Sequence, residues 1–155
     1  MPDYLAPTEA LSNLTTEALD LHRALRGSGS VHVRTLAARI TEAQTLSGNA
    51  LRLLLTLAQD QPRSRVKDLL LLERVAQIAK AGQDAGAELA AALARTVENQ
   101  RRCAGAASGP VVLIGPSPQQ FIESAADLLD CIPAHYHAIY RDGLLPPNLP
   151  THQPS

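Results

Sequence analysis

The densest collection of reactive side chains lies between residues 130 and 142. This stretch holds two of the five histidines, two of the three tyrosines and one of the two cysteines in the 155-residue chain. A metal site needs several ligands on one side of a helix, but His135 and His137 are two positions apart and point about 200° away from each other. His135 and Asp142 can share a face, yet two ligands do not make a zinc site. We therefore expect neither a metal nor another cofactor.

The same stretch contains a possible cysteine–histidine pair and two tyrosines. A thiolate beside an imidazole is the arrangement of a cysteine nucleophile with its base, but Pro133 separates Cys131 from His135 and leaves their geometry open. We favour a buried, small apolar cysteine and a surface histidine. Tyr136 and Tyr140 share a helix face, where they either dock the last helix or anchor a partner. The candidate binding residues are Phe121, His135, Tyr136 and Tyr140.

A group of basic residues in the first half of the chain is a second candidate site. Residues 21–74 hold nine basic and four acidic side chains, whereas residues 115–155 hold one basic and four acidic side chains. The excess indicates either ordinary solvated helix faces or complementarity with the acidic end, within the fold or between copies. Cations gathered on one surface could instead contact nucleic-acid phosphates. That alternative would use Arg34, Arg39, Arg52, Arg63, Arg65 and Lys67.

Known catalytic and phosphate-binding motifs do not fit the chain. Residues 109–117 look like a strand that enters a phosphate loop, but no lysine follows, and Pro116 and Pro118 remove amides that would bind phosphate. No nucleophile, base and orienting group occur together. The would-be recognition helix of a helix-turn-helix, around residues 51–57, is mostly leucine and resembles core rather than a base-reading surface. We therefore expect a protein that is not an enzyme.

The composition predicts helices. Apolar residues make up 45% of the chain, but only four residues are aromatic, so the apolar mass is mostly Ala and Leu. These are strong helix formers, whereas sheets favour β-branched and aromatic residues. The length fits one domain. Because two widely spaced cysteines suit a reducing compartment and no apolar run could cross a bilayer, we expect a cytoplasmic protein that does not bind membranes.

Apolar spacing predicts the first two helices. We expect Thr8 to cap the first helix and Gly27 to end it. The second helix should begin near Val33 and end at residues 60–62, with a kink or a break at Gly48. The expected buried stripes are Leu11, Leu14, Ala18, Leu21 and Leu25 in the first helix, and Leu36, Ile40, Ala43, Ala50, Leu54 and Leu57 in the second.

The third predicted helix runs from about Arg63 to Arg102, with a bend or a break plausible in residues 80–86. A row of small residues at a spacing of four, from Gly82 to Ala94, allows close contact with a neighbouring helix or a second copy. The alternative is a thin stripe that faces the core. The expected core stripe of this helix is Leu69, Leu72, Ala76, Ala79, Ala90, Leu93 and Val97.

A crossover rich in Gly, Ala and Pro follows at residues 104–118. Its apolar run, residues 111–114, has no partner strand, and a lone pair of strands would be marginal. We therefore expect an extended connection that lies over the bundle and is anchored by these apolar side chains.

The fourth helix has a strong start signal. Ser117, Pro118 and Gln120 predict a capping box. Pro133 is expected to open a separate short helix that Gly143 closes, and a disordered proline-rich tail follows. The expected buried stripe of the fourth helix is Ile122, Ala125, Leu129 and Ile132.

These elements predict a single all-α bundle of four to five helices over residues 1–143 and a flexible tail over residues 144–155. Leucines in residues 51–57 and 69–72 exceed what one buried stripe needs, so some should contact a second layer or subunit. We expect a non-enzymatic interaction or regulatory protein that associates with itself or with another protein. Two alternatives stay open, an Arg-rich DNA- or RNA-binding regulator and a small-ligand binder or enzyme with a site near Cys131, His135 and Tyr136.

Overall fold

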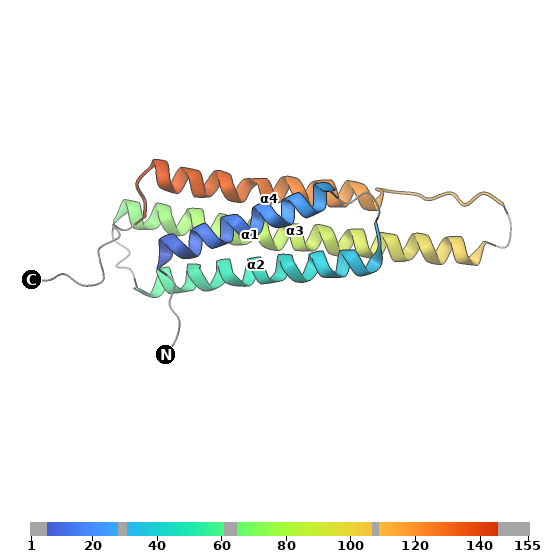
Figure 1. Ribbon diagram of the computed structural model, residues 1–155, viewed down its shortest axis with the longest axis horizontal. Coiled ribbons are helices and arrows are strands. Elements are labelled where there is room, and N and C mark those ends of the chain that lie inside the picture. Colours follow the sequence, from blue (N-terminus) through green and yellow to red (C-terminus); the bar gives the residue numbers. More distant parts are fainter. Residues whose placement is uncertain (1–5, 28–30, 61–64, 107–108, 146–155) are drawn as a thin grey trace, which may run out of the picture.

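The chain folds into one bundle of four helices. The computed structural model describes residues 6–27, 31–60, 65–106 and 109–145. The helices are α1 (Pro7–Gly27), α2 (Val33–Asp60), α3 (Val66–Gly105) and α4 (Pro118–Arg141). Successive helices run in opposite directions along the long axis (Figure 1). Because α1 and α3 each contact both α2 and α4 but not each other, they occupy opposite corners of the bundle.

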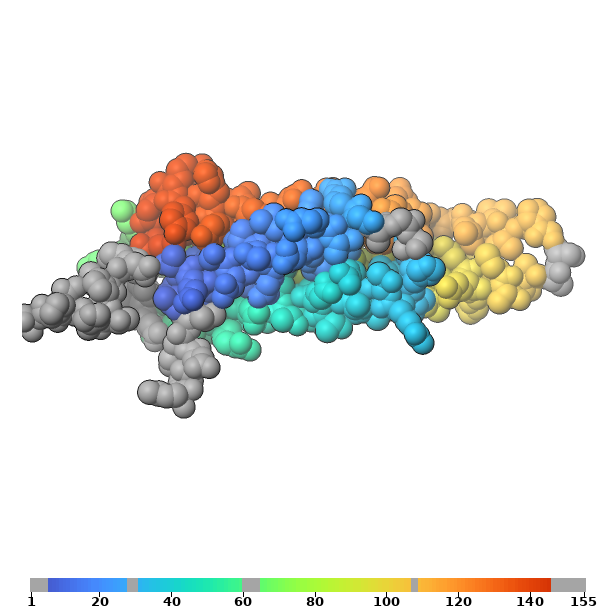
Figure 2. Space-filling view, in the orientation of Figure 1, coloured from blue at the N-terminus to red at the C-terminus, as the bar shows by residue number. Residues whose placement is uncertain are grey.

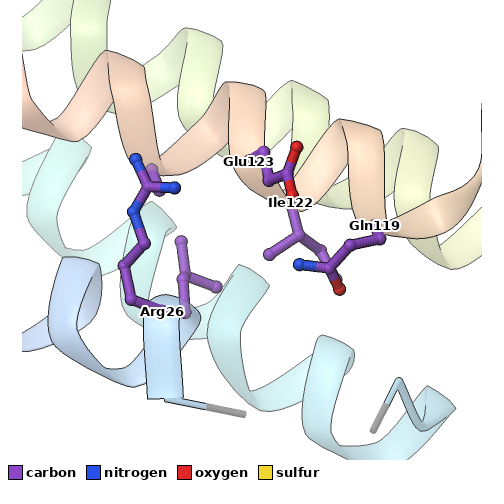
Figure 3. A pocket seen from close by; sticks show the side chains of 6 residues that line it. Arg26, Gln119, Ile122 and Glu123 are labelled. Carbon is purple, nitrogen blue, oxygen red and sulfur yellow. The ribbon is translucent and has the colours of Figure 1, made fainter. Parts of the chain in front are cut away.

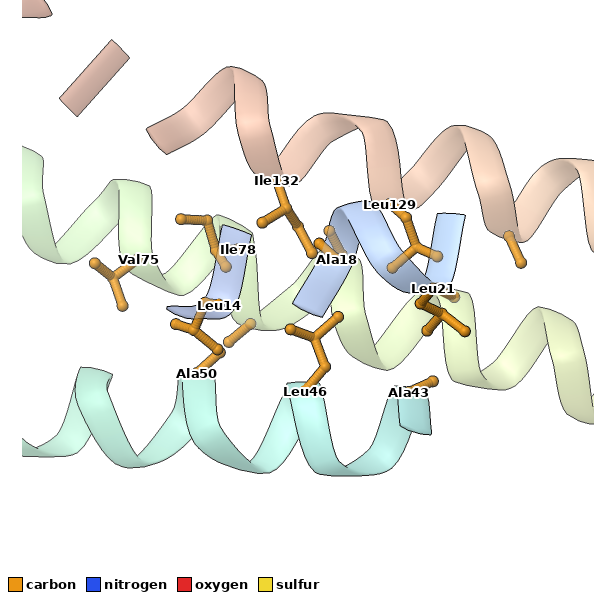
Figure 4. Packing of buried hydrophobic residues seen from close by; sticks show 14 of the residues in the cluster. Leu14, Ala18, Leu21, Ala43, Leu46, Ala50, Val75, Ile78, Leu129 and Ile132 are labelled. Carbon is orange, nitrogen blue, oxygen red and sulfur yellow. The ribbon is translucent and has the colours of Figure 1, made fainter. Parts of the chain in front are cut away.

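A single apolar core runs between the four helices. Leucine, isoleucine, valine and alanine side chains from all four helices point toward a common axis (Figure 4). The stripes predicted for α1 and α4 are buried throughout, which confirms both predictions. Full burial of one such large side chain stabilises the fold by roughly 1.5–3 kcal/mol. The largest fully buried side chains are Leu11, Leu46, Leu71, Val75, Ile78, Leu89, Leu129, Ile132 and Ile139.

The first two helices differ from prediction in small ways. α1 begins at Pro7, so Thr8 lies inside the first turn and does not cap it; the helix ends at Gly27 as expected. α2 continues through Gly48 without a break. Its predicted stripe is buried except at Ile40 and Leu54, which are half-buried.

The buried face of α3 differs from the predicted one. α3 is one continuous helix of 40 residues with no break at residues 80–86. Among the seven positions of the predicted stripe, Ala79 alone is buried. The helix carries two apolar stripes about a third of a turn apart, each with four large apolar side chains, so packing against α2 and α4 decides which stripe is buried. The core stripe contains Leu71, Val75, Ile78, Gly82, Ala85, Leu89, Ala92 and Thr96.

The start of α4 confirms the predicted capping box. The Oγ atom of Ser117 accepts a hydrogen bond from the backbone N–H of Gln120 at 3.3 Å. In return, Oε1 of Gln120 accepts one from the backbone N–H of Ser117 at 2.7 Å. Two backbone donors that a helix start would leave free are therefore satisfied.

The prediction of a separate last helix after Pro133 is wrong. α4 continues through Pro133 to Arg141, so the bundle has four helices rather than five. Proline removes one helical hydrogen bond and crowds the preceding turn. Ile132 and Ile139 on either side of it are fully buried in the same core, and this packing outweighs the local cost.

The C-terminus of α4 is closed by a Schellman motif. Gly143 has a φ of 62°, a conformation that favours glycine, and its N–H donates to the carbonyl of Tyr140 at 3.2 Å. The N–H of Leu144 donates to the carbonyl of Ile139 at 3.0 Å, and its side chain is buried. Leu144, the first residue of the predicted flexible tail, is therefore packed against the bundle. Residues 146–155 of that tail lie outside the described part of the chain.

The end of α3 and the segment that follows form a protruding arm, which we define as residues 97–105 and 109–116. This part of α3 continues beyond the first turn of α2, and residues 109–116 return beside it (Figures 1 and 2). The predicted apolar anchoring is wrong, since the side chains of Val112 and Ile114 are 71% and 72% exposed. The segment is held instead by Nη1 of Arg95, which donates to the carbonyl of Ile114 at 2.8 Å. Gly115, with a φ of 95°, leaves room for that guanidinium.

Candidate functional site

His135, the first of the predicted binding residues, joins α4 to α3. Nη1 of Arg74 lies 3.1 Å from Nδ1 of His135. A guanidinium has only donors, so Nδ1 accepts and the imidazole is neutral. Burial, followed by the charge of Arg74, lowers the pKa of His135 below its ordinary value of 6.5. The imidazole therefore acts as an interhelical hydrogen-bond acceptor.

The two C-terminal tyrosines form a small cluster against α1. The rings of Tyr136 and Tyr140 meet edge to face, with centroids 5.3 Å apart and planes inclined at 69°. The Tyr136 side chain also hydrogen-bonds to Ser12 on α1, and burial, followed by Tyr140, raises its pKa above 10.0. Phe121, at the other end of α4, is half-buried against the core. The candidate aromatic residues are thus spread along α4, and Tyr136 serves helix docking.

Cys131 and His135 have different partners. Sγ of Cys131 is exposed and lies 3.8 Å from the carbonyl of Asp127, to which it donates a weak hydrogen bond. His135 faces Arg74 on α3. The interpretation of Cys131 as a buried residue is therefore wrong. The structure does not bring the thiol and the imidazole together as a nucleophile and base.

The predicted charge complementarity occurs between α1 and α4. Nη2 of Arg26 lies 2.8 Å from Oδ1 of Asp127, and Nε2 of His22 lies 3.2 Å from Oδ1 of Asp130. Arg26 also borders a pocket of about 150 Å³ that Glu123 and other α4 residues line (Figure 3). Because the guanidinium of Arg26 already binds Asp127, it serves to join the two helices within one chain.

The basic residues proposed for phosphate contact do not gather in one place. Arg34 and Arg52 are exposed on α2 but lie about 27 Å apart at 1.5 Å per residue. Nη1 of Arg39 lies 3.1 Å from Oε2 of Glu42, which neutralises its charge. Arg65 and Lys67 are exposed at the start of α3. Arg63 lies outside the described residues.

A different feature stands out on the surface, a groove between α2 and α3. Its volume is about 520 Å³, compared with about 150 Å³ for the pocket beside Arg26. Two glycines of α3, Gly82 and Gly86, lie against α2 in this groove. A Cβ atom added to Gly82 would lie 3.4 Å from Cα of Ser47, and one added to Gly86 would lie 3.7 Å from Cβ of Ala43. The α2–α3 groove is lined by Ile40, Ala43, Gln44, Ser47, Gly48, Leu51, Gly82, Gln83, Gly86, Ala87 and Ala90.

All residues that line this groove are uncharged. The other three helix–helix interfaces each carry a polar bridge. Arg26 and His22 join α1 to α4, Arg74 joins α3 to α4, and Asn49 donates to Glu17 on α1 at 3.4 Å. Among the residues with described positions, no such side-chain bond joins α2 to α3. The outer side of this interface therefore carries neither a charged lining residue nor a side-chain bridge between its described residues.

The spare leucines predicted to contact a second layer extend the groove toward one end of the bundle. Leu55 lies one turn beyond the groove residue Leu51 and is 58% exposed, and Leu69 on α3 is 49% exposed. The small residues from Gly82 onward and the leucines of residues 51–57 were predicted to make such contacts, but Ile40, Gln44 and Gly48 on α2 were not. A usable signal was present, since positions 37, 40, 44, 48, 51 and 55 share one helix face and carry no charge.

The described residues show neither a metal-binding cluster nor a helix that could span a membrane. In the described segments, histidine, cysteine and acidic side chains form no group of three or more that could hold a metal ion. The helices there also lack the combination of length and apolar character that spanning a membrane requires. No family model, curated protein or solved structure matches the chain.

Proposed function

We propose that the chain is a non-enzymatic interaction protein that acts through protein–protein contacts and associates with itself. The observation that carries this proposal is the uncharged groove on the outer side of α2 and α3, continued by the exposed Leu55 and Leu69. A contiguous apolar surface of this kind marks an interaction site on a soluble domain.

The described candidates for chemistry support the same proposal. His135 accepts a hydrogen bond from Arg74, and Tyr136 bonds to α1, so both side chains already hold helices together. The nucleic-acid alternative receives less support, because the candidate cations are dispersed and Arg39 is paired with Glu42.

Analytical ultracentrifugation of the full chain tests the proposal. The reduced protein would be sedimented at concentrations from about 5 to about 500 µM, a range that covers weak and moderate affinities. Reducing agent is needed because Cys103 and Cys131 are exposed and could form disulfides between molecules. We expect the weight-average mass to rise with concentration toward a multiple of 16.5 kDa. A mass that stays at one chain over the whole range would contradict self-association.

A further inference from the structure

The midpoint of the groove contains a glycine that the fold of one chain does not require. Gly48 is exposed in the interior of α2, where glycine costs about 1 kcal/mol relative to alanine. A Cβ atom added there would meet nothing within 4 Å. Gly82 differs, because the backbone of Ser47 lies against it. An unexplained glycine on an apolar groove is expected where the backbone of another helix makes its closest approach.

We propose that a second copy of this chain occupies the α2–α3 groove, with a two-fold axis passing near Gly48. This inference rests on the proposed function, and it adds the surface through which the chain self-associates and the symmetry of the dimer. The two copies would pack with their α2 helices antiparallel, each against the same face of the other. Such an isologous contact requires a face that is complementary to itself.

The face has that property because its two halves differ in size. On one side of Gly48 the side chains include four leucines, and on the other they include four alanines together with Ile40, Gln44 and Gln83. Since Gly82 lies beside Ser47 and the helices are antiparallel, α3 residues before Gly82 belong to the first half and those after it to the second. The large half contains Leu51, Leu55, Leu69 and Leu72, and the small half contains Ala37, Ala87, Ala90 and Ala94.

A two-fold axis at the midpoint exchanges the halves. It places the leucines of one copy over the alanines of the other, which fills space on both sides of Gly48. The absence of charge in the groove is also consistent with a two-fold axis. Residues near a two-fold axis meet their own counterparts, so a charged residue there would face a like charge.

The size of the face is that of a small dimer interface. From Ala37 to Leu55 the uncharged face of α2 is about 27 Å long at 1.5 Å per residue. Two helices side by side cover a width of about 20 Å. The resulting area of about 540 Å² per copy, or about 1,100 Å² in total, reaches the roughly 1,000 Å² at which specific protein–protein interfaces begin.

The first experiment compares Gly48→Leu with Thr45→Leu in sedimentation equilibrium. Thr45 is exposed on α2 three residues away but does not line the groove. Both substitutions add an exposed leucine to the same helix, and leucine is a good helix former. We expect Gly48→Leu to weaken dimerisation at least about tenfold, which is 1.4 kcal/mol, and Thr45→Leu to leave it within about threefold. Circular dichroism would show that both variants keep their helices.

The second experiment tests the symmetry. In a background with Cys103→Ser and Cys131→Ser, Gly48→Cys is expected to form an intermolecular disulfide on mild oxidation, because the two Cα atoms at position 48 would lie within the roughly 7 Å that a disulfide spans. Thr45→Cys in the same background is the control and should remain monomeric on a non-reducing gel.

The outcomes separate this inference from the proposed function. A wild-type chain that stays monomeric contradicts both. If the dimer survives Gly48→Leu, or if Thr45→Leu weakens it equally, the chain self-associates but not through the groove. If Gly48→Leu disrupts the dimer but Gly48→Cys forms no crosslink, the two-fold geometry is contradicted.

Discussion

At the scale of single residues, the imidazole of His135 links proton binding to folding. Its Nδ1 accepts a hydrogen bond from Arg74 only while the ring is neutral, and burial also disfavours the charged form. A protonated ring would lose that bond and place a second cation beside the guanidinium. The folded chain therefore binds a proton at His135 less readily than the unfolded chain does.

This difference predicts a loss of stability in mild acid. Because the pKa of His135 is lower in the folded state, its contribution is fully present above pH 6.5 and declines as the pH falls through the folded-state pKa. The free energy of unfolding of the wild type should therefore fall relative to that of His135→Gln, which keeps an acceptor but does not titrate in this range. Urea unfolding of both proteins between pH 8 and pH 5 measures the difference. The other histidines are common to both proteins, so a difference that stays flat, or that grows with acid in favour of the wild type, contradicts the assignment.

At the scale of whole elements, α4 shows how tertiary packing overrides a local signal. Pro133 normally ends or kinks a helix, but the buried residues before and after it belong to one core-facing stripe. The helix therefore keeps a residue that lowers its own stability. By contrast, Pro118 sits in the first turn, where its missing N–H costs nothing.

Replacing these two prolines should have opposite consequences. Pro133→Ala restores a backbone donor in the helix interior and is expected to raise the free energy of unfolding by up to about 3 kcal/mol. Pro118→Ala is the matched control, and we expect it to leave stability unchanged or to lower it slightly, since proline favours the helix start and restricts the unfolded chain. Thermal and chemical unfolding followed by circular dichroism measure both variants. If Pro133→Ala is no more stable than the wild type, the proline must contribute a contact or a bend that the core requires.

The elements also show which features the sequence can predict. The stripes of α1 and α4 are predictable because each helix has one apolar face, and the capping box is predictable because Ser117, Pro118 and Gln120 act locally. The buried face of α3 is not, because two apolar stripes compete and only packing against α2 and α4 selects one. The groove could not be predicted from the sequence for a related reason. Its residues carry neither a charge nor a reactive group, and the uncharged face of α2 becomes one wall of a groove only when α2 lies beside α3.

At the scale of the whole molecule, the chain divides into a packed bundle and an arm that adds nothing to its core. Core side chains are found on α3 as far as Thr96 and resume on α4 at Phe121 and Ile122. Between them, Arg95 holds the described residues of the arm, since its guanidinium bonds to the carbonyl of Ile114 and pairs with Glu98 at 3.4 Å. The bundle should therefore fold without most of the arm.

Deleting the arm tests this division. Because the carbonyl of Ile114 lies 2.8 Å from the guanidinium of Arg95, a four-residue Gly/Ser linker can join Val97 to Gly115 in place of residues 98–114. We expect the free energy of unfolding to change by less than about 1 kcal/mol, because no core contact is lost and a shorter loop costs slightly less entropy to close. Leu89→Ala, at a fully buried position of the same helix, is the control and should cost about 2–5 kcal/mol. Urea unfolding of the deletion variant, the control and the wild type gives the comparison. A deletion as costly as Leu89→Ala would mean that the arm stabilises the bundle through contacts beyond those that Ile114 and Glu98 make with Arg95.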